Sequence, residues 1–304
     1  MSIHKSVLKG EVLALLRGCQ SLYDGTLGLG GHSRAFLDEN EGAKLFATDQ
    51  DEEALNLAKT LLPEASLALA NFKDCFNIWP KLNVEGMLLD LGISSLQLDK
   101  DERGFSTKSS ELDMRMNKEL DMDAKQVVNT YSKQELERVL REYGELKNAR
   151  DIAELIIKAR GVARIEKARE LSMLFNRAKL RGRHVELATV VFQAIRMEVN
   201  KELEVLRSFL SELEARVRAG QLRPILVVIS FHSLEDRIVK GYFKKWASAC
   251  GCEDLALRCT CSRGNKIGEV LTKKPVEASL EELRDNSRAR SARLRAFRFL
   301  GPCR

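Results

Sequence analysis

A glycine-rich segment, Asp24-Gly-Thr-Leu-Gly-Leu-Gly-Gly-His32, carries the strongest chemical signal in the sequence. It lies between a strand expected at residues 21–24 and a helix expected to begin at Gly31. Ligands of open α/β sheets bind at the edge formed by the carboxyl ends of the strands, and glycines there let the backbone come close to the ligand. The free amides at a helix start favour an anionic group such as a carboxylate. The spacing is GxGG and not the GxGxxG of dinucleotide enzymes, so the turn alone does not identify the ligand.

Two residues at neighbouring strand ends have the chemistry to bind a nucleoside. Asp49 ends the strand expected at 44–49, where a carboxylate can accept hydrogen bonds from both hydroxyls of a ribose. The alternative is capping of the next helix, for which Asp51 is better placed. Phe72 follows the strand expected at 66–70, where it would either contact an adenine or pack in the core. Together they predict a cofactor that contains a nucleoside.

The strand expected at 87–90 ends at Asp90, and Leu-Gly-Ile-Ser-Ser-Leu-Gln-Leu-Asp99 follows. This loop stands at the same sheet edge, so we expect the substrate to react there. The alternative is an ordinary loop in which Ser94 or Ser95 caps a helix. The loop carries no cysteine, which argues against a thiol nucleophile in it.

The pattern of elements predicts an α/β fold. Helices expected from Gly31, at 51–61 and at 73–79 alternate with the strands, which is typical of a parallel, doubly wound sheet. Residues 112–213 read almost entirely as helix, and a buried strand then follows at 224–230. Ser233 and Asp236 resemble a capping box for a helix at 233–246, and late strands are expected at 268–273 and 293–299. We predict a sheet domain (1–108 and 205–304, with a basic tail) and an inserted helical domain for substrate recognition (109–204).

Composition limits the class of protein. Of the 304 residues, 44% are hydrophobic and 31% are charged, as in a soluble globular protein. No apolar run approaches the ~18 residues of a membrane helix. The N-terminus lacks the apolar segment and cleavage site of a signal peptide. The sequence therefore predicts a cytoplasmic protein without a membrane partner.

Positive charge is clustered, although the net charge is only +6. The 158–183 cluster holds nine lysines and arginines against two glutamates, and the 284–304 cluster holds seven arginines against one aspartate. Two such clusters fit contact with a phosphate backbone. The alternative for each is a solvated surface.

Four of the seven cysteines form the pattern CxC-x6-CxC: Cys250, Cys252, Cys259 and Cys261. Four thiolates are enough for a tetrahedral zinc site, although CxxC is the usual half-site. The alternative is a loop of reduced cysteines, as expected inside a cell.

Several motifs, taken in order, resemble the ribosomal RNA small subunit methyltransferase H family over nearly the whole chain. They are DGTLGLGGHS (24–33), LLDLGISSLQLD (88–99), RGFS (103–106), LDMRM (112–116), FQAIRMEVNKEL (192–203), SFHSLEDRIVK (230–240) and SRARSARLR (287–295). LDMRM and SFHSLEDRIVK are the most specific. The resemblance implies a Rossmann-like methyltransferase domain with an inserted helical domain.

The resemblance also implies an activity. The family transfers a methyl group from S-adenosylmethionine to the exocyclic N4 amine of a cytidine in the decoding centre of small-subunit (16S) rRNA. Its partner would be the small ribosomal subunit; a homodimer is left open. The family's cofactor positions fall here on Gly30, Gly31, His32, Asp49, Phe72, Asp90 and Gln97.

Three segments depart from the family pattern. The family's H-x-P-V-L-L appears as His4-Lys-Ser-Val-Leu-Lys9, which places Ser6 where the family has proline. Its N-P-R-S-R-S appears as Asn286-Ser-Arg-Ala-Arg-Ser291. Near His184, Glu186 and Val190 replace a histidine and an arginine of the family. The last change affects the expected substrate contact and leaves the cofactor positions intact.

The expected reaction asks little of the enzyme beyond alignment and exclusion of water, because a sulfonium methyl is already activated. A cytosine amine is a weak nucleophile, so an acceptor for its proton would help. Asp113 and His232 are the candidate catalytic residues. The alternative for Asp113 is an ion pair with Arg115 or Arg103. The alternative for His232 is a hydrogen bond to a residue that supports the site, without contact to the reacting atoms. The target base would be unstacked before reaction.

Two other classes of protein remain open on the sequence alone. One is a non-catalytic RNA-binding assembly factor that keeps the cofactor fold, against which the intact set of cofactor residues argues. The other is a nicotinamide-dependent oxidoreductase, which the GxGG spacing disfavours.

Overall fold

The computed structural model describes residues 5–175, 186–250 and 265–300. By their internal contacts the residues form two compact units, Met1–Gly92 with Glu204–Arg304, and Ile93–Leu203. The predicted helical domain begins at residue 109, whereas the second unit begins at Ile93. The difference arises because Ile93, Leu98 and Phe105 already pack on the core of the helical unit.

A seven-stranded sheet of order β3-β2-β1-β4-β5-β7-β6 forms the centre of the first unit. Strands β1 to β5 are parallel, and β7 runs antiparallel between β5 and β6. The predicted α/β sheet is therefore confirmed, with an antiparallel edge that the sequence did not predict. The strands are β1 (Ser21–Asp24), β2 (Lys44–Asp49), β3 (Ser66–Leu69), β4 (Gly86–Asp90), β5 (Ile225–Ser230), β6 (Gly268–Val270) and β7 (Arg293–Phe299).

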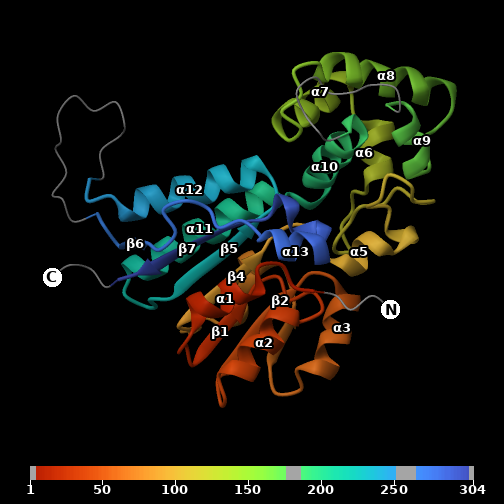
Figure 1. Ribbon diagram of the computed structural model, residues 1–304. Coiled ribbons are helices and arrows are strands. Elements are labelled where there is room, and N and C mark those ends of the chain that lie inside the picture. Colours follow the sequence, from red (N-terminus) through yellow and green to blue (C-terminus); the bar gives the residue numbers. More distant parts are fainter. Residues whose placement is uncertain (1–4, 176–185, 251–264, 301–304) are drawn as a thin grey trace. The chain divides into compact units, whose positions relative to one another are not determined.

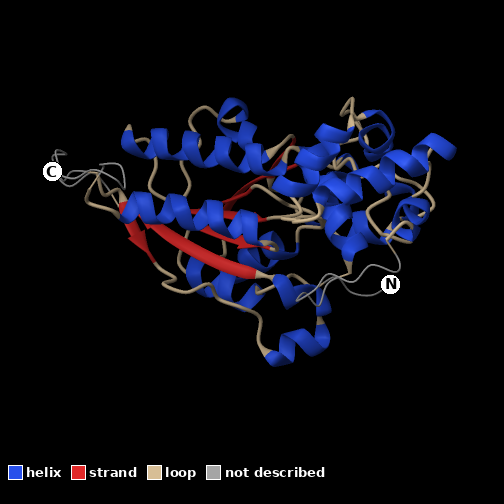
Figure 2. Ribbon diagram, turned by 90° about the horizontal axis from the view of Figure 1, so that it is seen from above, coloured by secondary structure: helices blue, strands red, loops and turns tan. Residues whose placement is uncertain are grey.

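Helices cover both faces of this sheet. Figure 1 shows α1, α2 and α3 on one face and α11 and α12 on the other, and Figure 2 shows the strands between these layers. The central strands are apolar and buried, as Leu88, Val227 and Ile229 illustrate, because both faces are covered. The helices are α1 (Lys9–Leu16), α2 (Gly31–Glu39), α3 (Glu52–Leu61), α4 (Cys75–Ile78), α11 (Glu202–Arg218, in this unit from Glu204), α12 (Ser233–Ala247) and α13 (Leu280–Asp285), with short 3-10 turns at Phe72–Asp74 and Ser287–Ser291.

The second unit has a core of its own. Val127, Leu136, Leu140, Ile152 and Ile156 are buried in it, on the apolar faces of its amphipathic helices. Within its described residues, the regular elements are helices. They are α5 (Ser95–Asp99), a 3-10 turn (Asp101–Arg103), α6 (Ala124–Thr130), α7 (Lys133–Glu142), α8 (Ala149–Val162), α9 (Ala168–Met173) and α10 (Leu187–Asn200).

Two local predictions were wrong. The N-cap of α12 is His232, whose Nδ1 accepts the Glu235 backbone N–H at 3.4 Å, and not Ser233, which is already the first helical residue. Strand β6 ends at Val270, three residues before the predicted end at 273. Within the described helices, none is both long and apolar enough to cross a membrane.

Candidate active site

Three aspartates end neighbouring parallel strands at one edge of the sheet. Asp24 ends β1, Asp49 ends β2 and Asp90 ends β4, and these strands are adjacent in the order β2-β1-β4. Because the strands are parallel, their carboxyl ends meet at the same edge. The topology therefore brings together the residues that the sequence selected at strand ends.

Asp24 holds the glycine-rich loop in place. Its side chain is buried, accepts the Thr26 backbone N–H at 3.1 Å and accepts the Ser33 hydroxyl at 2.6 Å. Burial raises the pKa of this carboxyl above its ordinary value. Thr26 Oγ1 in turn accepts the Asp90 backbone N–H at 2.6 Å, which ties the loop after β1 to the end of β4. Sequence reasoning missed this network, although an aspartate at a strand end with threonine two residues later could have suggested it.

The start of α2 has no side-chain cap. Its N-cap, Gly30, has a left-handed φ of 76° and makes no side-chain cap hydrogen bond. Glycine is required there because the conformation is unfavourable for other residues, and because an added Cβ would lie 2.9 Å from Leu62. The first amides of the helix are therefore free of a side-chain cap and suited to an anion.

Asp49 is held by two backbone amides. Its Oδ2 accepts the Gly28 N–H at 2.7 Å, and its Oδ1 accepts the Asp51 N–H at 2.8 Å. Burial raises its pKa to about 6, although both hydrogen bonds oppose the shift. Each carboxylate oxygen keeps a lone pair that a ribose hydroxyl could use. The structure confirms Asp51 as the N-cap of α3, since its side chain accepts the Glu53 N–H.

Phe72 lies just after β3 and is 8% exposed. Its ring packs edge-on against Phe209 with the centroids 5.6 Å apart, and its carbonyl accepts the Tyr23 hydroxyl at 3.3 Å. Core packing thus fixes Phe72 at the sheet edge. Its contact with an adenine remains a prediction.

The buried His32 lies beside the partly exposed Asp90 at this edge. His32 Nε2 lies 3.6 Å from Asp90 Oδ2, which is too long for a hydrogen bond. In the described part of the chain, both ring nitrogens of His32 and Oδ1 of Asp90 are buried without a hydrogen-bond partner. Each such atom costs about 1–3 kcal/mol unless a partner is bound. The pair therefore points to a polar ligand, and a cofactor with ammonium, carboxylate and ribose groups fits the residues present.

Gln97 belongs to the helical unit. With Ser94 it forms a capping box at the start of α5, in which the Gln97 N–H donates to Ser94 Oγ at 3.2 Å and its Oε1 accepts the Ser94 N–H at 3.1 Å. The structure confirms the capping role considered for Ser94. The cofactor contact of Gln97 remains a prediction.

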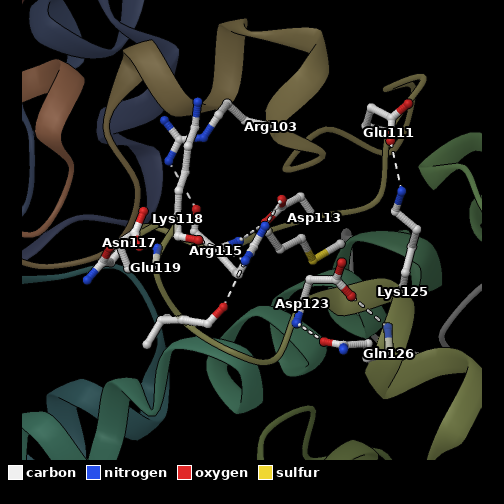
Figure 3. A network of polar contacts seen from close by, with 12 residues as sticks. Arg103, Glu111, Asp113, Arg115, Asn117, Lys118, Glu119, Asp123, Lys125 and Gln126 are labelled. Atoms are coloured by element: carbon white, nitrogen blue, oxygen red, sulfur yellow. Dashed lines mark hydrogen bonds and ion pairs between the residues drawn. The ribbon is translucent and has the colours of Figure 1, made fainter.

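Asp113 lies in an ion pair (Figure 3). Arg115 Nε donates to its Oδ1 at 2.9 Å and Arg115 Nη2 to its Oδ2 at 2.8 Å. Burial raises the pKa of Asp113, but the hydrogen bonds and charge of Arg115 outweigh it and lower the pKa. Arg115 also donates to the Lys118 and Leu120 carbonyls, so it braces the loop that follows. The structure thus shows the alternative considered for Asp113, an ion pair with Arg115.

His232 caps α12 through Nδ1, while its Nε2 lies 3.0 Å from Oε1 of the buried Glu235. When Nδ1 is an acceptor, a neutral imidazole carries its proton on Nε2. The ring is then oriented by its own helix. This geometry favours the alternative in which His232 acts outside the reacting atoms.

The basic clusters are partly neutralised. In the 158–183 cluster, Lys158 pairs with Glu154 at 2.9 Å and Arg164 with Glu166 at 2.7 Å, both on exposed surface. In the 284–304 cluster, Arg295 is buried and donates to both oxygens of Asp236, so it is structural and unsuited to phosphate. Residues Arg177, Lys179, Arg181, Arg183 and Arg304 lie outside the described part of the chain.

Two further predictions fall largely outside the described residues. Of the four paired cysteines, only Cys250 is described, and it is exposed, whereas Cys252, Cys259 and Cys261 are not described. His184 is likewise outside the described residues. Val190 is buried in the core of the helical unit, so the residue that replaces the family's arginine serves packing.

The seven-stranded sheet and the site at its strand ends define a class I methyltransferase. A family model described as the MraW methylase family matches residues 1–300, and the chain therefore belongs to that family.

Two relatives are both named ribosomal RNA small subunit methyltransferase H. The one from Campylobacter concisus is 46% identical over 99% of this chain and 99% of its own length. The one from Campylobacter lari is 45% identical over 98% of this chain and 99% of its own length. A solved structure of a candidate rRNA-methylase from Clostridium thermocellum covers 98% of this chain and 100% of that chain with a TM-score of 0.43 at 9% identity.

Proposed function

We propose that the protein transfers a methyl group from S-adenosylmethionine to the N4 amine of a cytidine in the decoding centre of 16S rRNA, in the cytoplasm. The observation that carries this proposal is end-to-end similarity, at 45–46% identity, to relatives named for methylation of small-subunit rRNA. The unpartnered His32 and Asp90 at the sheet edge support a polar cofactor there. The choice of the cytidine amine rests on the sequence motifs.

The cofactor residues have distinct roles in this proposal. The amides at Gly30 and Gly31 bind the methionine carboxylate, because the helix start is electropositive. Asp49 accepts hydrogen bonds from the ribose hydroxyls. The ligand's methionine part supplies partners for the polar atoms of His32 and Asp90, while Phe72 borders the adenine. Gln97 remains a cofactor residue on the family motif alone.

When bound, the cofactor supplies an activated methyl group. The protein then has to align the amine with that methyl group and exclude water. Asp113 and His232 remain the candidates for handling the amine proton. Since Arg115 occupies both oxygens of Asp113 and Glu235 adjoins His232, each would act mainly by positioning. Loss of activity in Asp113→Asn or His232→Ala, with cofactor affinity unchanged, would support a role in the reaction.

We further propose that the helical domain (109–204) and the two basic clusters recognise the rRNA, presented by a largely assembled small subunit. Exposed arginines and lysines fit phosphate contacts, whereas the buried Arg295 does not.

The decisive experiment incubates the enzyme and labelled cofactor with free rRNA, and separately with subunits that lack the modification. Mass spectrometry then identifies the labelled nucleoside. Label on the cytidine N4 amine, in subunits only, is the expected result. Label on a ring carbon or ribose, or equal activity on free RNA, would contradict it, and absence of transfer with intact RNA binding would indicate an assembly factor.

A further inference from the structure

The segment just before α1 passes over the start of α2. We call residues 5–8 the N-terminal strap. Ser6 lies against Gly31, the first residue of α2: a Cβ added to Gly31 would overlap Ser6 Oγ, and the Ser6 Cβ would be 3.7 Å away. The Ser6 hydroxyl is therefore next to the helix start that lacks a side-chain cap.

The strap is held at both ends. Leu8 is fully buried, and its backbone N–H donates to Glu282 Oε1 of α13 at 2.7 Å. At the other end, the Lys5 carbonyl accepts from Asn286 Nδ2 at 3.1 Å, and Lys5 Nζ pairs with Asp285 at 2.8 Å. Helix α13 (labelled in Figure 1) and the residue after it, distant in sequence, thus hold the strap on both sides of Ser6.

The Ser6 hydroxyl is available to bind a ligand. Ser6 is half-buried and makes no hydrogen bond within the described part of the chain. His32, the second residue of α2, is 7% exposed and has both ring nitrogens unpartnered there. The buried His32 side chain therefore lacks the partner that a bound polar group would supply, and the Ser6 hydroxyl lies beside the residue that precedes His32.

We propose that the Ser6 hydroxyl binds the methionine carboxylate of the cofactor. The inference rests on the cofactor assignment above and deepens it. A hydroxyl donates to a carboxylate in a short, charge-assisted hydrogen bond, and the α2 amides favour the same negative charge.

The first test measures binding by calorimetry for wild type, Ser6→Ala and Ser6→Thr, with two ligands. S-adenosylmethionine carries the carboxylate, and methylthioadenosine lacks it. Loss of a hydrogen bond to a charged group predicts about tenfold weaker S-adenosylmethionine binding in Ser6→Ala. Methylthioadenosine should bind equally to wild type and Ser6→Ala, and Ser6→Thr should restore the affinity for S-adenosylmethionine.

Each other outcome has a distinct meaning. Wild-type affinity of Ser6→Ala for S-adenosylmethionine overturns the inference and leaves the proposed function intact. Equal weakening for both ligands reduces Ser6 to strap packing and also overturns it. A folded wild type that binds neither ligand overturns the cofactor assignment itself.

A second test needs no ligand. Gly31→Ala should destabilise the protein because the new Cβ overlaps Ser6 Oγ, and less so in a Ser6→Ala background, where the nearest strap atom is Cβ at 3.7 Å. Urea unfolding of the two single variants and the double variant measures this coupling. Additive effects would show that Ser6 does not lie against Gly31 in solution, and would remove the basis of the inference.

Discussion

Replacing Asp49 with alanine should weaken cofactor binding without unfolding the protein. The carboxylate is positioned by the Gly28 and Asp51 amides at 2.7 and 2.8 Å, which leaves it further lone pairs to accept from the proposed ribose. A hydrogen bond to a charged group contributes about 1.5–3 kcal/mol, which corresponds to roughly 10- to 150-fold in affinity.

The pH dependence of binding follows from burial of the same carboxyl. Its pKa is raised from 3.8 to about 6, and only the ionised carboxylate can accept hydrogen bonds from the two amides and a ribose hydroxyl at the same time. As the pH falls through 6, the protonated fraction grows, so wild-type affinity should decline by about tenfold per pH unit below that value. The Asp49→Ala variant should lack this decline.

Folding stability of the cofactor-free protein should change with pH in the opposite direction to cofactor affinity. A carboxyl whose pKa is higher in the folded state stabilises folding in acid and loses that contribution as the pH rises through 6. The free energy of unfolding of wild type, relative to Asp49→Ala, should therefore increase as the pH falls from 6 to 4.

Calorimetry with S-adenosylmethionine from pH 5 to 8, with thermal unfolding as the folding check, measures the binding effects. Asp51→Ala is the matched control: it removes the cap of α3, at a cost of about 1 kcal/mol in stability, and should leave affinity unchanged. A folded Asp49→Ala with wild-type affinity, or a wild-type affinity that is flat from pH 7 to 5, would refute the reasoning.

Three further predictions concern other parts of the chain. Neutralising several arginines of the 158–183 and 284–304 clusters should flatten the plot of log affinity for rRNA against log salt; an identical slope would make the clusters solvated surface only. Elemental analysis of protein purified without chelator should find one zinc per chain at Cys250, Cys252, Cys259 and Cys261; content well below one after zinc addition would exclude the site. Glu214→Ala should cost about 2–3 kcal/mol in urea unfolding at pH 7, because Glu214 accepts the buried Trp246 Nε1–H at 2.9 Å. Hydrogen bonds from Lys245, Trp246 and Arg218 outweigh burial and lower the pKa of Glu214, so this contribution should fade below pH 4.5, and unchanged stability would contradict it.

The sheet could be predicted because its strands have a local signature. Runs such as residues 87–89 and 225–229 are apolar on both faces, which is typical of strands in a sheet covered on both sides. The direction of β7 could not be predicted, since pairing with β5 depends on contacts between distant segments. The cap of α12 was misassigned because His232 is an uncommon cap, and only its backbone angles reveal the role.

The charge pattern shows a similar limit. Arg295 counts as one more positive charge in the sequence, yet in the fold it is a buried partner of Asp236, which lies 59 residues earlier. Sequence alone does not reveal such a pair, because β7 and α12 are brought together by the sheet. A basic cluster read from composition therefore overstates the charge available to RNA.

The two kinds of site residue differ in what determines them. Asp49 and Asp90 follow from topology: a polar residue at the end of a parallel strand must lie at the ligand edge, whatever its side chain does there. Asp113 and His232 were chosen for their chemical type, and chemical type does not tell which neighbour a side chain binds. Arg115 and Glu235, each within three residues, already engage them. Ser6 was noted in the sequence only as a departure from a proline, because its contact with Gly31 depends on α13, almost three hundred residues later. The proposed cofactor residues at the strand ends thus follow from the order of strands, whereas the proposed role of Ser6 depends on packing between remote segments.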